Sequence, residues 1–166
     1  MLLPLAVVAG CGPAPAAPVT ATSPDPVQVT VPGAVAPPSQ PETVEPRGPS
    51  GQLPLVSAVT AATIARLTVI GTPLQELGGV ARAVADVGGI RRYMLLARVA
   101  TNRIAALDAR CTHEGCTVDR FSAPLFECPC HGSQFDWTGQ VRRGPAPAAL
   151  PSLTVEFDGA VARIVL

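Results

Sequence analysis

The sequence predicts an all-β fold, a small antiparallel sandwich or barrel over residues 57–166 with two loops inserted in it. From residue 80 onward, short apolar runs alternate with turn residues at the spacing that is typical of such folds. The dipeptide Asp158-Gly159 separates two strand-like runs and accepts the positive backbone angles of a tight hairpin turn. Helix signals are weak and centre on one short stretch, residues 73–79. Together these observations favour a β scaffold over a helical one.

An apolar run at residues 53–70 predicts the first part of this domain. Pro54, Arg66 and several Ser and Thr residues argue against a membrane span, so the run predicts the approach to the domain and a first strand. The stretch PLQELGG, residues 73–79, predicts a single helical turn closed by Gly78. Further strands are expected over residues 80–86, 91–99, 103–109, 152–157 and 160–166, with a turn at Thr101-Asn102 and a rigid proline-rich loop over 144–151.

The chain begins with an uncharged apolar stretch, MLLPLAVVAG, which is shorter than the roughly 20 residues of a membrane-spanning helix. A signal peptide over residues 1–11 is the better interpretation. The run VAGC resembles a bacterial lipobox, which implies that Cys11 is lipidated and anchors the protein at the extracytoplasmic face of the cell membrane. No Lys or Arg precedes the apolar run, and this departure leaves open a start further upstream or a stray cysteine.

Residues 12–56 are expected to form a disordered tether that is rich in Pro and Ala. Between residues 12 and 50, eleven positions are proline and none is aromatic. Such a segment cannot bury enough apolar surface to offset the entropy that it would lose on ordering. We therefore expect the folded domain to begin at about residue 57.

The balance of acidic and basic residues indicates which partners are not expected to bind through net charge. It has twelve basic residues, all of them Arg, and twelve acidic residues, with an isoelectric point of about 6.7. This balance argues against nucleic-acid binding driven by net charge. Outside the two loops described next, no residues resemble a substrate pocket, so we do not expect an independent enzyme.

The two loops hold four of the five cysteines and both histidines. The first loop, CTHEGC over residues 111–116, and the second, CPCHGSQFD over 128–136, space them as Cys111, His113, Cys116 and as Cys128, Cys130, His131. A structural zinc site would use four of these groups, but zinc loops usually pair their ligands as C-x-x-C or H-x-x-x-H. A cysteine protease needs one nucleophile rather than a doubled set. A third kind of site accounts for all six residues at once.

The pattern C-x-H followed by C-x-x-H resembles the ligand set of Rieske [2Fe-2S] proteins, over roughly residues 66–166 of this chain. The resemblance implies one [2Fe-2S] cluster with two histidines on one of its irons. The implied ligands are Cys111, His113, Cys128 and His131. It also implies that Cys116 and Cys130 form the disulfide that joins the two loops in the high-potential branch of the family. An extracytoplasmic location permits such a bond.

Histidine ligation implies a high reduction potential. Two thiolates leave the oxidised centre neutral, whereas four would leave it doubly negative and harder to reduce. Rieske potentials accordingly lie at roughly −150 to +300 mV, against roughly −400 mV for plant-type clusters. In this family each ligand imidazole keeps one nitrogen near solvent, so that reduction can be coupled to uptake of a proton. Such coupling is the chemistry of quinol oxidation.

Residues beside the ligands match positions that tune the cluster in the family. Ser133, which follows Gly132 in CHGS, matches a serine that donates a hydrogen bond to a bridging sulfide. Phe135 stands where high-potential members carry a tyrosine whose hydroxyl donates to a ligand thiolate, so we expect a potential below the top of the range. The GPAP sequence that contains Pro145 resembles the proline loop that shields the cluster. Glu114 departs from quinol-oxidising members, which commonly carry an apolar residue on this docking tip.

The resemblance implies one-electron, proton-coupled transfer in an extracytoplasmic, membrane-associated redox chain, such as a cytochrome bc-type quinol-oxidising complex. The expected protein partners are cytochromes of the b or c type, and quinol is a candidate electron donor. The lipid anchor is expected to attach the protein to the membrane. A small subunit of a larger oxidoreductase, as in arsenite oxidase, is an alternative of a different class. A structural zinc-binding or redox-sensing module is a second alternative. A carrier should purify alone, whereas a subunit should co-purify with a large partner.

Overall fold

The computed structural model of the protein describes residues 42–166. The predicted signal peptide with Cys11, and the predicted tether up to residue 41, lie outside the described residues. Within residues 42–166 the one helical element is a 3-10 turn, η1 (Pro73–Gln75), at the place where the sequence predicts a helical turn. No helix in this part of the chain is long and apolar enough to cross a bilayer. The predicted all-β class is confirmed.

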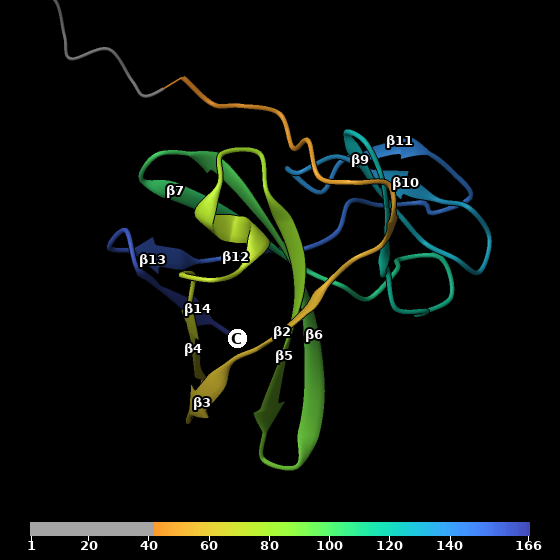
Figure 1. Ribbon diagram of the computed structural model, residues 1–166. Helices are drawn as coiled ribbons and strands as arrows, with labels where there is room; N and C mark the ends of the chain where they lie inside the picture. The colour runs from red at the N-terminus through yellow and green to blue at the C-terminus, as the bar shows by residue number, and fades with distance from the viewer. Residues whose placement is uncertain (1–41) are drawn as a thin grey trace, which may run out of the picture. The chain divides into compact units, whose positions relative to one another are not determined.

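The strands form three sheets, which we name A, B and C (Figure 1). Sheet A holds, in spatial order, β1 (Gly51–Gln52), β8 (Arg120–Ser122), β9 (Leu125–Glu127), β10 (Gln134–Phe135) and β11 (Val141–Arg143). Sheet B holds β12 (Ser152–Leu153), β7 (Arg103–Asp108), β6 (Ile90–Ala100), β5 (Val80–Val87) and β2 (Leu55–Ser57). Sheet C holds β13 (Val155–Phe157), β14 (Val161–Val165), β4 (Ile64–Thr68) and β3 (Val59–Ala61).

Two details of the topology differ from the sequence prediction. The pairing is antiparallel except between β2 and β5, which run parallel. The single strand expected over 152–157 is divided at Thr154, because β12 pairs with β7 in sheet B whereas β13 pairs with β14 in sheet C. The chain thus passes from one sheet to another at this residue, a change that no turn signal in the sequence marks.

The folded chain begins earlier than residue 57. Residues 42–56, which the composition assigns to the tether, pair with the body of the domain through β1 and β2. Upstream of β1, the N–H of Val44 donates to the carbonyl of Val99. Directly after β1, Leu53 is buried in the core. The prolines of residues 42–56 are compatible with this extended path along the sheet edges, because an edge strand needs few hydrogen bonds to neighbouring strands.

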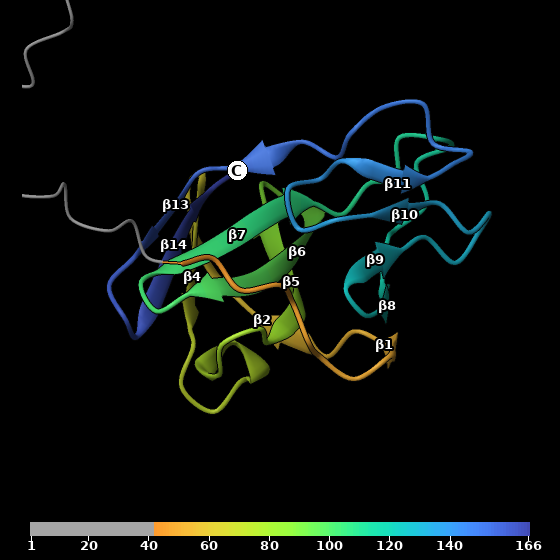
Figure 2. The same cartoon turned by 90° about the horizontal axis from the view of Figure 1, so that it is seen from above.

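Sheet B lies between two apolar cores, and alternate residues of β6 enter each of them. Leu95, Ala97 and Val99 pack into the core shared with sheet A, whereas Met94 and Leu96 pack into the core shared with sheet C. Successive side chains of a strand point to opposite faces, so a strand covered on both sides is apolar at consecutive positions, as β6 is over residues 94–97. Figure 2 shows sheet A to one side of sheet B, with the chain between β7 and β11 forming the loops there.

A charge pair ties the first loop to sheet B. Asp119, which directly precedes β8, accepts a hydrogen bond from Nη1 of Arg82 on β5 at 3.3 Å, and both side chains are largely buried. The backbone carbonyl of Asp119 also accepts from the N–H of Leu53 at 2.7 Å. These contacts hold the start of β8 against sheet B. They therefore also hold the end of the first loop, which precedes β8, in place.

Candidate metal centre

The first loop is a closed turn that presents a histidine at the surface. The N–H of Cys111 donates to the carbonyl of Cys116 at 2.8 Å, and the N–H of Gly115 donates to the carbonyl of Cys111 at 2.9 Å. Gly115 has a φ of 78°, in the region that favours glycine. His113 lies between these closing hydrogen bonds.

The second loop repeats this backbone pattern. The N–H of Cys128 donates to the carbonyl of Ser133 at 2.8 Å, and the N–H of Gly132 donates to the carbonyl of Cys128 at 3.0 Å. Gly132 also has a positive φ, of 71°. In both loops the glycine is the fourth residue after the buried cysteine, so the two sequences form the same backbone turn, although the histidine is the second residue after the cysteine in the first loop and the third in the second.

A disulfide joins the loops, as the resemblance implied. Cys116 and Cys130 are bonded, with their Cα atoms 6.6 Å apart. The other two cysteines of the region, Cys111 and Cys128, are free thiols and are buried. Burial raises the pKa of the Cys128 thiol, although the backbone N–H groups of Cys130 and His131 point at the sulfur and oppose this shift. The same N–H groups would stabilise a thiolate bound to a metal.

The two histidines converge through one nitrogen each. Nδ1 of His113 lies 3.2 Å from Nδ1 of His131, and the ring planes are at 89° to each other. Their Nε2 atoms face outward toward Glu114, and the side chains are 28% and 45% exposed. Two Nδ1 atoms at this separation can bind one metal ion while the Nε2 atoms remain accessible to solvent.

The chemical types of the possible ligands in the two loops distinguish a zinc site from an iron-sulfur cluster. Sulfur atoms of Cys116, Cys128 and Cys130 lie within 4.8 Å of one another, as a zinc site would need. Two of these three sulfurs form the disulfide, however, and zinc binds thiolates. Besides the carboxylate of Glu114, which lies beside the two imidazoles, the donors that remain in the two loops of the described chain include two free thiols and two imidazoles, the set that a Rieske cluster requires.

The proline-rich loop packs beside these donors, as predicted. The backbone N–H of Ala146 donates to Oγ of Ser133 at 3.0 Å, and Oγ1 of Thr112 donates to the carbonyl of Ala148 at 2.6 Å. Ser133 is fully buried, and because its oxygen accepts from Ala146, its own hydrogen is left to donate to a further acceptor. Pro145 itself is exposed on the outer side of this loop.

Phe135 is fully buried in the core that also contains the two free cysteines. Replacing Phe135 by Tyr is expected to raise the reduction potential of the centre, because a hydroxyl that donates to a ligand thiolate stabilises the more negative, reduced state. A redox titration of the two proteins side by side checks this. An unchanged or lowered potential in the variant would count against the position assigned to this ring.

The sequence analysis missed Asp136, whose carboxylate organises the turn after the second loop. Its Oδ1 accepts from the N–H of Thr138 at 2.8 Å, from Oγ1 of Thr138 at 2.6 Å and from the N–H of Gln140 at 3.1 Å. Its Oδ2 accepts from Nε of Arg142 at 2.8 Å. The sequence Asp-x-Thr-Gly is a recognisable signal for such a side-chain-capped turn.

The pH dependence of stability follows from this network. Burial acts to raise the pKa of Asp136, but hydrogen bonds from Thr138, Arg142 and Gln140 outweigh it and leave the pKa below its ordinary value. A lowered folded-state pKa stabilises the fold above the unfolded value of about 3.9, and the contribution is lost as the pH falls through the folded value.

Asp136→Asn is therefore expected to lower the free energy of unfolding by about 2 kcal/mol at pH 7. The difference from wild type should shrink as the pH falls below about 4, where the unfolded chain binds a proton at this carboxylate, and should be smallest below the folded pKa, where the native carboxylate is protonated too. Urea unfolding of both proteins from about pH 2 to about pH 7 measures this, because the carboxylate titrates below about pH 4 in both the folded and the unfolded state. A gap that is constant across this range would show that the charge of Asp136 is not what stabilises the turn.

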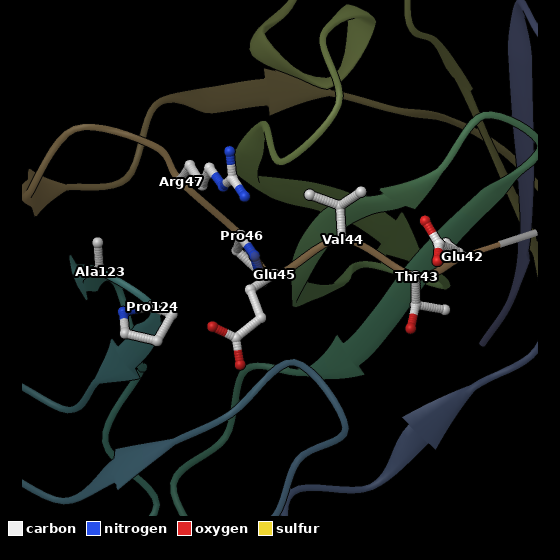
Figure 3. A pocket seen from close by; sticks show the side chains of 8 residues that line it. All are labelled: Glu42, Thr43, Val44, Glu45, Pro46, Arg47, Ala123 and Pro124. Atoms are coloured by element: carbon white, nitrogen blue, oxygen red, sulfur yellow. The ribbon is translucent and has the colours of Figure 1, made fainter.

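A hollow elsewhere on the protein does not coincide with these donors. It has a volume of about 880 Å³ and is lined by residues 42–47 together with Ala123 and Pro124 (Figure 3). None of these residues is a predicted site residue. The side chains of Glu45 and Pro124 face the same space from different segments of the chain. The hollow is therefore separate from the two loops that hold the predicted ligands.

The sequence model of the Rieske [2Fe-2S] domain family matches residues 60–154, more than half of the chain. A cyanelle cytochrome b6-f complex iron-sulfur subunit of Cyanophora paradoxa is 47% identical over 77 residues, which are 45% of this chain and 32% of that protein. The cytochrome b6-f complex iron-sulfur subunit of Prochlorococcus marinus (strain MIT 9301) is 37% identical over 97 residues, 54% of each chain. The matched region thus spans between about a third and about half of the length of these relatives.

Among solved structures, the cyanobacterial plasma membrane Rieske protein PetC3 from Synechocystis PCC 6803 is 30% identical to this chain. The match covers 50% of this chain and 84% of that protein, with a TM-score of 0.40. The family assignment depends on the sequence match over residues 60–154 and not on this superposition.

Proposed function

The chain belongs to the Rieske [2Fe-2S] domain family, and on that premise we propose that it transfers single electrons through a [2Fe-2S] cluster held between its two loops. The proposed ligands are Cys111 and His113 from the first loop, and Cys128 and His131 from the second. Such a cluster, when bound, takes up and releases one electron at a high potential. The reduction potential of the cluster and its coupling to a proton depend on the residues around it.

One observation carries the proposal. The Nδ1 atoms of His113 and His131 lie 3.2 Å apart, and the same two loops supply two buried free thiols. This arrangement supports binding of one iron by the two imidazoles and of the other by the two thiolates. Because the two thiols are buried, the iron that they bind would be shielded from solvent. Because the two imidazoles are exposed, the iron that they bind would lie within reach of a redox partner.

The exposed Nε2 atoms support coupling of the electron to a proton. The side chains of His113 and His131 are 28% and 45% exposed, and their Nδ1 atoms are the ones that converge. Each Nε2 can therefore hold a proton or release it to solvent or to a bound quinol. A ligand imidazole becomes more basic when the metal it binds is reduced, so reduction should favour protonation at this atom.

The proposed setting is a membrane-associated redox chain outside the cytoplasm, with cytochromes as partners. The relatives are named as subunits of cytochrome b6-f complexes. The Cys116–Cys130 disulfide is of the kind that persists in oxidising compartments. Anchoring through lipidated Cys11 and oxidation of quinol are parts of this proposal, as are the boundaries of the signal peptide and tether.

Stopped-flow mixing of the reduced full-length protein with a ferric c-type cytochrome tests the proposal. We expect haem reduction at a rate that rises with protein concentration, and no such reduction by a Cys128→Ser variant that lacks the cluster. A protein with a full complement of cluster that reduces the cytochrome no faster than this variant would contradict the carrier function. Co-purification from membranes with one large partner would instead favour a subunit of an oxidoreductase.

A further inference from the structure

Glu114 lies at the tip of the first loop, beside the outer nitrogens of both histidines. Its Oε1 is 3.9 Å from Nε2 of His113, and its Oε2 is 3.9 Å from Nε2 of His131. The two histidines belong to different loops, so one carboxylate spans the gap between them. The distances exceed those of direct hydrogen bonds, and the interaction is therefore mainly electrostatic.

The charge of this carboxylate is not neutralised by an arginine. Among residues 42–166, the Arg or His nitrogens within 4.0 Å of a carboxylate oxygen of Glu114 are those of the two imidazoles. The guanidinium of Arg110, on the chain just before the first loop, lies against Gly115 instead. The negative charge of Glu114 is thus directed at the imidazoles, although its side chain is 62% exposed and partly screened by solvent.

The sign of the effect follows from the charge of the centre. The oxidised centre carries one more positive charge than the reduced centre, and part of that charge resides on the imidazoles that bind the iron. A carboxylate charge 3.9 Å from the outer nitrogen of a ligand histidine stabilises this positive charge through space. It therefore stabilises the oxidised state more than the reduced state.

We propose that Glu114 is a positioning residue that acts through both ligand imidazoles by its charge and lowers the reduction potential of the centre. The inference rests on the proposed ligand set, because it requires that both Nδ1 atoms bind iron. It adds a second determinant of the potential to the one expected from Phe135, and both act in the same direction. A carboxylate at this position also makes the surface around the histidines acidic rather than apolar.

Glu114→Gln is the variant that tests this, with Glu76→Gln as the matched control. Both remove one exposed carboxylate, but Glu76 is the residue that follows η1, and η1 contacts β5 and β6. The full-length proteins are compared by redox titration at one pH and low ionic strength, where screening is weakest. Glu114→Asp, which keeps the charge on a shorter side chain, is titrated alongside them.

We expect a positive shift of the midpoint potential for Glu114→Gln that is larger than the shift for Glu76→Gln, and an intermediate value for Glu114→Asp. The electron paramagnetic resonance spectrum of Glu114→Gln should remain that of a Rieske centre with altered line positions. Equal shifts in the two glutamine variants, or a negative shift for Glu114→Gln, would overturn the inference. A wild-type protein without a Rieske spectrum would overturn the proposed function instead, so the two failures are distinguishable.

Discussion

Replacing either His113 or His131 by Ala is expected to abolish the Rieske electron paramagnetic resonance spectrum completely. Each histidine supplies one of the two Nδ1 atoms that converge to 3.2 Å, so its removal leaves one iron without a full set of protein ligands. The measurement is the spectrum of the dithionite-reduced full-length variants, together with their iron content. A normal spectrum from either variant would remove that histidine from the ligand set.

Glu114→Gln serves as the control for these histidine variants. The carboxylate of Glu114 lies within 4.8 Å of the donor atoms of both histidines, and these three residues could together hold a single metal ion. In that case the glutamine variant would lose its metal as the histidine variants do. The proposed cluster predicts that it retains a full complement of iron and a Rieske spectrum.

Removing the disulfide is expected to produce the largest loss of stability. Cys116 and Cys130 are separated by 14 residues, and closing a loop of about 15 residues stabilises a fold by roughly 3 kcal/mol. The double variant Cys116→Ser and Cys130→Ser, which leaves no unpaired thiol, should lose about that much unfolding free energy. We also expect a weaker and less persistent cluster signal, because the two loops would no longer be joined beside the ligands.

Urea unfolding of the metal-free proteins measures this loss without a contribution from the cluster. Wild-type protein under reducing conditions is the internal control, since it should unfold at the urea concentration of the double variant. A loss of less than about 0.5 kcal/mol would mean that the paired turns hold the loops together without the disulfide.

The sequence predicted the elements whose signals are local. The hairpin at Asp158-Gly159 and the strands around Thr101-Asn102 need only a turn and an apolar run on each side, and they are present in the structure. The helical turn before Gly78 is likewise a local signal. The disulfide between Cys116 and Cys130 came from the resemblance to a family, because spacing alone does not determine which cysteines pair.

The features that the sequence did not predict depend on contacts with distant residues. Residues 42–56 have the composition of a tether, but Leu53 is buried and β2 pairs in parallel with β5, which lies more than 20 residues further along the chain. The division of residues 152–157 at Thr154 depends on which sheet accepts each half. The reach of Glu114 to a histidine on the second loop is visible only once the loops are joined.

A redox titration of the full-length protein, followed by electron paramagnetic resonance at several pH values, tests the central claim most directly. We predict a Rieske signal in the reduced protein and a midpoint potential that falls as the pH rises, because reduction is coupled to protonation of the ligand histidines. A protein that gives no signal and contains stoichiometric zinc would contradict this account and would show that the two loops form a structural metal site.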